Sequence, residues 1–182
     1  MTVKPRTIHR INRRFVTITS LFLLLHLLSL FNTQLHAQLV GEQAELERLE
    51  TQAMNAMAIG DPHGAALSIG KAAMMLAILA KKDFDGTLKS AYSGTESLFR
   101  TQENSYRAIA LFEQAGGQPP APTGACQLLT LANHHNVTAK KIFSNIDRTE
   151  SSKAVSIVQQ YMPQVQEWLG IVQELQAEFA CS

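Results

Sequence analysis

Three histidines lie after residue 37, and they are the first residues to consider as metal ligands. His134 and His135 are adjacent, and His63 stands alone. Neighbouring residues on a helix point in different directions, and two ligands on one helix usually lie three or four positions apart. Thr138 and Ala139 occupy the positions four residues after the histidine pair. We therefore expect no metal site, with His135 at the edge of the core and His134 in solvent.

Four methionines form the second group with possible metal chemistry. Met54 and Met57 share one helical face, and Met74 and Met75 follow after a turn. Thioether ligands are typical of some copper sites. Methionine at helical spacing more often fills gaps in a core, because its side chain is flexible and apolar. The sequence therefore predicts core methionines and no bound cofactor.

Catalysis by acid and base would require carboxylates in unusual surroundings. Glu96, Glu103 and Glu113 lie near Arg100 and Arg107, at spacings that favour ion pairs on a helix surface. The sequence contains no nucleophile elbow, phosphate-binding loop, haem-attachment motif or zinc-finger spacing. We therefore expect a protein that is not an enzyme.

The chain contains two cysteines, Cys126 and Cys181, and its first 37 residues, described below, predict export. This predicts a disulfide, which would stabilise the fold by about 4 kcal/mol in the chain-entropy model. The alternative is a pair of free thiols, one of them near the end of the chain.

Residues 1–37 have the order of a cleavable secretory signal. They contain five basic residues and no acidic ones, an apolar run over 15–31, and a small residue, Ala37, at the end. Cleavage between Ala37 and Gln38 would leave a periplasmic or secreted protein. The alternative is an uncleaved inner-membrane anchor formed by residues 15–31, since this run is near the lower limit for crossing a bilayer.

The predicted mature chain, residues 38–182, is mildly acidic. Removal of the signal takes away five of the 16 basic side chains and none of the 15 acidic ones, which leaves a net charge of −4. A nucleic acid is not an expected partner, because binding phosphates requires a basic face. We expect contact with the membrane only through the signal segment before cleavage. The length suits a single domain with one core.

Apolar residues recur at helical spacing throughout this domain, so we predict an all-α fold, an up-and-down bundle of four to five helices. The range 62–82 begins with clear punctuation, Gly60-Asp61-Pro62, and is apolar on most sides, which predicts a central buried helix. In the range 87–115, polar residues 102–105 indicate either a break or an exposed turn, so one helix or two remain open. The expected helices cover residues 42–59, 62–82, 87–115, 125–146 and 154–179.

The last predicted helix has the most regular pattern. Its apolar residues alternate spacings of four and three, with Trp168 in the middle and expected to be buried, and with Pro163 off this row as the cause of a local bend. The polar link 147–151 is short, so the last two helices should run antiparallel and bring Cys181 back toward Cys126. The row consists of Ala154, Val158, Tyr161, Val165, Trp168, Val172, Leu175 and Phe179.

Part of the chain resembles a tetratricopeptide repeat over about 34 residues. Tyr92 and Phe99 lie where the first helix of that motif has aromatic residues, although Glu96 stands where it has a small one. The resemblance implies an alternative fold of tetratricopeptide-like helical hairpins. The positions that match the second helix are Ala108, Ile109, Phe112, Ala115 and Pro120.

The most distinctive loop connects the third and fourth predicted helices. It is stiff and uncharged, and a stiff loop loses little entropy on docking, so we treat it as a candidate interaction loop. Its residues are Gly116, Gly117, Gln118, Pro119, Pro120 and Pro122.

Together these features favour a non-catalytic exported helical protein that binds an unknown protein partner in the bacterial cell envelope. The alternative is a periplasmic sensor or carrier that binds a small molecule between helices. A carrier should contain a cavity lined by Met74, Met75 and Trp168, whereas an interaction module should have a solid core and an exposed apolar patch.

Overall fold

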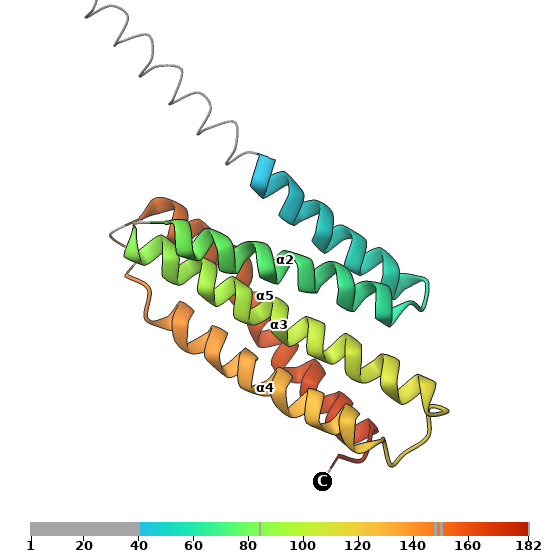
Figure 1. Ribbon diagram of the computed structural model, residues 1–182. Coiled ribbons are helices and arrows are strands. Elements are labelled where there is room, and N and C mark those ends of the chain that lie inside the picture. Colours follow the sequence, from blue (N-terminus) through green and yellow to red (C-terminus); the bar gives the residue numbers. More distant parts are fainter. Residues whose placement is uncertain (1–40, 84, 148, 150, 182) are drawn as a thin grey trace, which may run out of the picture. The chain divides into compact units, whose positions relative to one another are not determined.

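The computed structural model describes residues 41–83, 85–147, 149 and 151–181 (Figure 1). The predicted signal segment, its cleavage position and the alternative anchor at 15–31 lie outside the described residues. The chain divides into two compact units, Met1–Glu45 and Leu46–Ser182. In the first unit, residues 41–45 are described and are helical. The helices, the disulfide and the surfaces described below all belong to the second unit.

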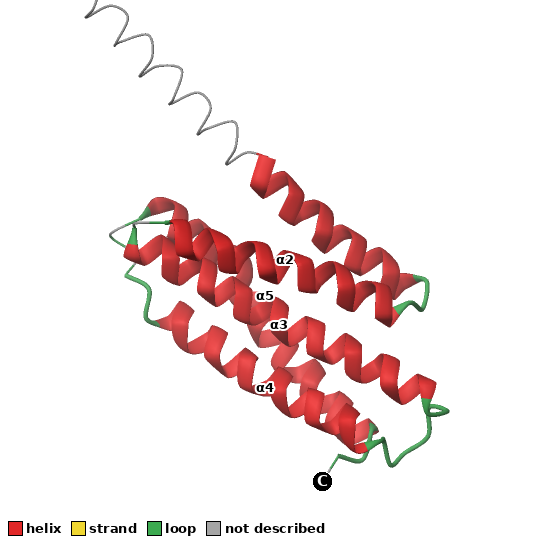
Figure 2. Cartoon of the chain, in the orientation of Figure 1, coloured by secondary structure: helices red, strands yellow, loops and turns green. Residues whose placement is uncertain are grey.

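The second unit is all-helical in its described residues, so the predicted fold class is confirmed (Figure 2). Residues 46–58 are helical and are followed by four labelled helices. The bounds of these are α2 Pro62–Lys82, α3 Gly86–Gln114, α4 Thr123–Ser144 and α5 Ser152–Glu178. Each predicted range is matched within a few residues, and 87–115 is one helix.

The continuity of α3 excludes the tetratricopeptide alternative. That motif requires its two halves to lie on two antiparallel helices joined by a turn. Tyr92, Phe99 and Phe112 instead lie on the same helix. The matching spacing therefore comes from a single helix that is packed on several sides.

Side-chain caps explain where the helices begin. The Asp61 carboxylate accepts a hydrogen bond from the Gly64 amide, and Pro62 stands in the first turn of α2. Asp85 accepts from the amides of Thr87 and Leu88 at the start of α3. These caps satisfy amides that have no partner within the helix, and they fix the turn before each helix.

The central helix is α3, which lies against α2, α4 and α5, whereas α2 neighbours only α3 among these helices. The prediction that the range 62–82 is central is therefore wrong. The outer side of α2 carries large apolar residues that are at least half exposed, namely Leu67, Met74 and Ile78. Apolar composition alone did not distinguish a helix packed on two sides from one packed all round.

The contact between α3 and α4 is close because small residues line it. A Cβ atom on Gly94 would lie 2.4 Å from a ring carbon of Phe143. At the other end of the same two helices, Phe112 packs in one cluster with Ala125 and Leu129. The buried residues of α4 between these ends are spaced four and three apart, and they are Ala125, Leu129, Ala132, Asn136, Ala139 and Phe143.

The apolar row predicted for α5 faces the core. Tyr161 and Trp168 make edge-to-face ring contacts with Phe99 and Tyr106 of α3, at centroid distances of 5.7 and 5.5 Å. Trp168 is partly buried, so the prediction that it is buried holds only in part; its large indole packs at the edge of the core. Pro163 is exposed and α5 continues through it.

Candidate functional site

The polar stretch in the middle of α3 is buried, contrary to the predicted break or exposed turn. Thr101 and Ser105 are fully buried, and their hydroxyls donate hydrogen bonds to the carbonyls of Ser97 and Thr101. The Asn104 amide donates to the Arg100 carbonyl. Because these groups find partners within their own helix, polar residues can occupy the core without the cost of unpaired polar atoms.

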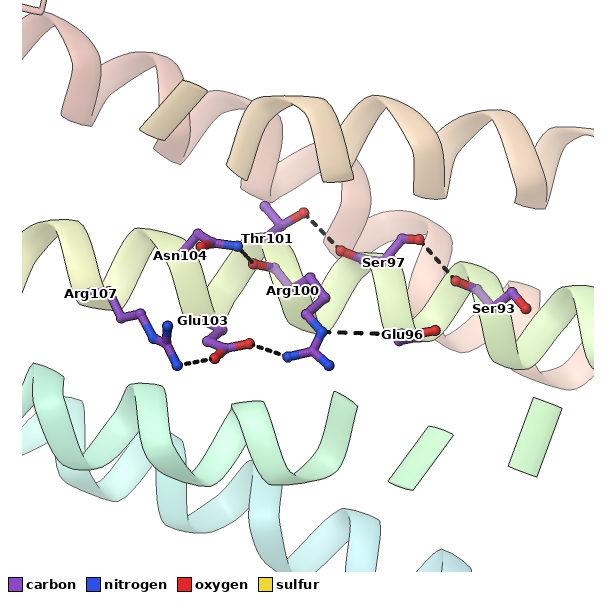
Figure 3. Close-up of polar contacts among 8 residues, drawn as sticks. All are labelled: Ser93, Glu96, Ser97, Arg100, Thr101, Glu103, Asn104 and Arg107. Atoms are coloured by element: carbon purple, nitrogen blue, oxygen red, sulfur yellow. Dashed lines mark hydrogen bonds and ion pairs between the residues drawn. The ribbon is translucent and has the colours of Figure 1, made fainter. Parts of the chain in front are cut away.

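Glu103 is clamped between two arginines of the same helix (Figure 3). Its two carboxylate oxygens lie 2.7 Å from Arg100 Nη1 and 2.5 Å from Arg107 Nη2. Arg100 Nε also lies 3.8 Å from a carboxylate oxygen of Glu96. The predicted pairing is confirmed, but Glu103 is only 5% exposed, so its predicted place on the helix surface is wrong.

Helix α2 covers this clamp at Gly70. A Cβ atom there would lie 2.9 Å from Glu103 Oε1, so a glycine leaves the room that the carboxylate needs. Both oxygens of Glu103 are engaged and its charge is compensated. The arrangement therefore positions α2 on α3 and offers no free acid or base for catalysis.

The histidine pair lies where the sequence predicts. His134 is exposed, and His135 is partly buried beside it, with ring centroids 6.0 Å apart. Burial lowers the pKa of His135, and the charges of His134 and Arg100 lower it further. Within the described part of the chain, no three His, Cys, Asp or Glu residues are grouped so as to hold a metal ion.

Asn136 is a buried polar residue that sequence reasoning missed. Its side chain is 1% exposed, and neither its amide nitrogen nor its oxygen has a hydrogen-bond partner. The buried row of α4 contains Ala132, Asn136, Ala139 and Phe143, whereas Leu128 is partly buried and Leu131 is exposed. The row Ala132–Asn136–Ala139 was visible in the sequence, yet the asparagine hid its apolar character.

The disulfide prediction is confirmed. Cys126 and Cys181 are bonded, with Cα atoms 5.4 Å apart. Beside them the Ala121 amide donates to the Phe179 carbonyl at 2.9 Å, and the rings of Phe112 and Phe179 stack at 4.0 Å. One end of the bundle is therefore held by a covalent bond, a hydrogen bond and an aromatic contact.

The candidate interaction loop projects from this end. Residues 116–120 are exposed. Gly116 and Gly117 have positive φ angles of 100° and 65°, which favour glycine, and their amides donate back to Glu113 and Phe112 carbonyls. The loop is thus anchored on both sides while its prolines remain in solvent.

A row of exposed side chains follows the outer side of α2, and we call it the outer stripe: Leu67, Lys71, Met74 and Ile78. Its three apolar members are 51%, 58% and 50% exposed. Met54, on residues 46–58, is 62% exposed, so the prediction of core methionines is wrong for Met54 and Met74. Met57 and Met75 are partly buried against the core.

A carboxyl group with altered acidity joins residues 46–58 to α5. The Tyr161 hydroxyl donates to Glu50 Oε2 at 3.3 Å. Burial raises the pKa of Glu50 to about 7, the hydrogen bond from Tyr161 lowers it, and the negative charge of Glu47 raises it. Burial also raises the pKa of Tyr161. Sequence reasoning gave no sign of this contact, because its two residues are 111 positions apart.

A hollow of about 360 Å³ lies where α3 begins and α4 ends. Its carboxylates already have partners in the chain: Asp85 caps α3, and Asp147 accepts hydrogen bonds from Thr149, which lower the pKa of Asp147. Neither of the two carboxylates that line the hollow is therefore free to act as a catalytic acid or base. It is lined by Asp85, Gly86, Thr87, Ser90, Ile142, Asn145, Ile146 and Asp147.

Comparison with known proteins adds no assignment: no protein-family model, curated protein or solved structure matches the chain. Among the helices of the described residues, α2 is the one that is long and apolar enough to cross a membrane, with a mean hydropathy of 1.5 over its most apolar window. Half of that window is buried in the fold, as is common in a core helix of a bundle.

Proposed function

We propose that this protein is a non-catalytic exported module that binds another protein of the bacterial cell envelope through the outer stripe of α2. The observation that carries the proposal is the exposure of Leu67, Met74 and Ile78, each at least half in solvent, on one side of one helix. Exposed apolar residues gathered in this way are typical of interaction sites. The signal-like residues 1–37 and the disulfide support export.

The spacing of the outer stripe favours a helical partner. Leu67, Lys71, Met74 and Ile78 are separated by four, three and four positions, which is the spacing of a coiled-coil seam. A seam of this kind is narrow, whereas a helix that lies on a lipid surface presents a wide apolar face. Lys71 is exposed within the stripe and α2 contains no acidic residue, so an acidic side chain on the partner would complement it.

The small-molecule carrier receives less support. It requires Met74, Met75 and Trp168 to line a cavity between helices. Met74 is 58% exposed on the outer side of α2, and Trp168 packs on Tyr106 of α3. These three residues therefore do not enclose a common space. The proline-rich loop is the alternative contact for a protein partner, since residues 116–120 are exposed.

Site-specific photo-cross-linking tests the proposal in the native envelope. A photoreactive amino acid is placed at Leu67 or Met74, at Gln118 of the loop, and at Lys140 of α4, an exposed position away from both surfaces. We expect one discrete cross-linked protein from the two α2 positions and none from Lys140. Mass spectrometry of the adduct then identifies the partner, and intact mass tests whether the chain begins at Gln38.

A charge placed on the stripe provides the matched test. Met74→Glu should abolish the cross-link from position 67, while the urea unfolding curve changes by less than about 0.5 kcal/mol, because an exposed side chain contributes little to stability. Lys140→Glu is the control and should keep the cross-link. Adducts from Gln118 alone would move the contact to the loop, and adducts with lipid or with a second copy of the chain would overturn the proposed partner.

A further inference from the structure

The exposed side chains of α2 form one continuous row that extends the outer stripe at both ends. Successive members as far as Lys81 are three or four positions apart, so the row follows the whole helix, a length of roughly 30 Å for a rise of about 1.5 Å per residue. All other residues of α2 are buried or partly buried, so a partner of α2 can contact this one face only. The row consists of His63, Leu67, Lys71, Met74, Ile78, Lys81 and Lys82.

The residues that flank this row are small or apolar and carry no charge. Gly64, Ser68, Met75 and Ala77 are partly exposed beside it. Small flanking side chains let two helices approach until their axes are about 8–10 Å apart. In paired helices the flanking positions usually carry the charges that select a partner. On α2 that selection must instead come from the charges within the row itself.

All charges within the row are positive. Lys71 lies between Leu67 and Met74, and Lys81 follows Ile78 by three positions. Helix α2 contains no acidic residue, and within the described part of the chain Lys71 and Lys81 have no salt-bridge partner. A lysine that is covered by a partner loses hydration, which is costly unless an acidic group compensates its charge. A purely apolar helix is therefore a poor match for this row.

We infer that the partner presents an acidic amphipathic helix to α2, with carboxylates that face Lys71 and Lys81 and with apolar side chains between them. This inference rests on the proposed function and specifies the chemistry of the partner. The two lysines are 81 − 71 = 10 positions apart, about 15 Å along the helix. The acidic residues of the partner helix should therefore lie about ten positions apart, with apolar residues at alternating spacings of three and four between them.

Charge and width disfavour two other occupants of the row. Pairing of α2 with α2 of a second copy brings together two helices that have basic residues and no acidic ones, and juxtaposed like charges oppose binding. A surface of anionic lipids would attract the lysines, but a helix that lies on lipid presents a wide apolar face. The exposed apolar side chains of α2 are Leu67, Met74 and Ile78, which form a narrow row. An acidic helix matches both the charge and the width.

Cross-linking in the native envelope tests the chemistry of the partner. With the photoreactive amino acid at Leu67, mass spectrometry should map the adduct to a segment of the partner with acidic residues about ten positions apart. The double variant Lys71→Glu with Lys81→Glu keeps the apolar stripe and should lower the yield of this adduct about ten-fold or more. The control, Lys140→Glu with Lys141→Glu at two exposed positions of α4, makes the same change in charge and should keep the yield. Both double variants should unfold in urea at the wild-type midpoint.

Two synthetic helical peptides provide a second test with defined probes. Both peptides have leucine at alternating spacings of three and four, and two positions about ten apart carry glutamate in one peptide and lysine in the other. The wild-type chain should bind the glutamate peptide about ten-fold more tightly than the lysine peptide, as measured by fluorescence anisotropy. The variant Lys71→Glu with Lys81→Glu should reverse this order.

The outcomes separate the acidic helix from the proposed function. Absence of any protein adduct from Leu67 would overturn both. An adduct whose yield is unchanged in the variant Lys71→Glu with Lys81→Glu, or whose mapped segment contains no acidic residue, would overturn the acidic helix and leave the interaction site in place. Equal affinity of the wild-type chain for the two peptides, or an adduct with lipid or with a second copy, would also overturn it. The mapped segment and the peptide preference use wild-type lysines, so they decide even if the double variant fails to fold.

Discussion

Gly94 and Phe143 set the distance between α3 and α4, and Gly94→Ala tests that contact. The added methyl carbon would lie 2.4 and 2.7 Å from two carbons of the Phe143 ring. Ordinary carbon contacts are about 3.5–4.0 Å long, so the ring or the helices must shift by roughly an ångström. Phe143 is 2% exposed, so its ring is enclosed by the core, and protein cores are close-packed.

The expected loss follows from two opposing terms. Replacing glycine by alanine in the middle of a helix stabilises it by about 1 kcal/mol. Overpacking a close-packed core typically costs about 1–3 kcal/mol, and a contact this short belongs at the upper end. We therefore expect Gly94→Ala to lower the free energy of unfolding by about 2 kcal/mol, which corresponds to a fall of about 4–8 °C in Tm for a domain of this size.

Gly170→Ala on α5 is the matched control. A Cβ atom at Gly170 would meet no other atom within 4 Å, so only the helix term remains. This variant should gain about 0.5–1 kcal/mol. Urea unfolding followed by circular dichroism measures both variants, and they should differ by about 3 kcal/mol.

A second substitution shows whether the clash is the cause. Phe143→Leu removes the ring, so in the Gly94→Ala background it should cost less than it does alone, which a double-mutant cycle measures. The reasoning would be refuted if Gly94→Ala were as stable as Gly170→Ala. It would also be refuted if the effects of Gly94→Ala and Phe143→Leu were simply additive.

Two further predictions concern the end of the bundle and its core. Cys126→Ser should lower the free energy of unfolding by about 2–4 kcal/mol, because the disulfide closes a loop between positions 55 residues apart. Urea unfolding with and without reductant measures this loss. Reductant should destabilise the wild-type protein and leave the variant unchanged. Asn136→Leu should raise the free energy of unfolding by about 1–2 kcal/mol, since it removes two buried polar atoms without partners. An equally large gain from Asn55→Leu, at an exposed helical position, would contradict the role of burial.

Local signals in the sequence were sufficient to predict the helices. The bounds of α2 follow from Gly60-Asp61-Pro62 and from the two lysines at its end, because capping and proline geometry act within a few residues. The disulfide also followed from local information. The short link 147–151 makes α4 and α5 antiparallel, and this returns Cys181 to Cys126.

The choice of central helix depended on contacts between distant residues, and it could not be predicted from local pattern. In α3 the polar residues 102–105 indicated a break or an exposed turn, but they are buried, and the Ser105 hydroxyl donates to a carbonyl of its own helix. In α2 the many apolar residues indicated burial, yet Leu67 and Met74 lie outside. The link between Glu50 and Tyr161 was hidden for the same reason.

The bond between Cys126 and Cys181 makes the two ends of the bundle unequal. At this end the N-terminus of α4 and the C-terminus of α5 cannot separate while the bond is intact, and the hydrogen bond from Ala121 to Phe179 closes the gap beside it. At the opposite end α4 and α5 are connected by the link 145–151 and by apolar packing, since Phe143, Ile146 and Ala154 belong to one core cluster; both cysteines of the chain are used at the first end. On heating, α4 and α5 therefore separate first at the link and last at the disulfide. The loop at residues 116–122 lies beside the disulfide, so it keeps its position until this last step.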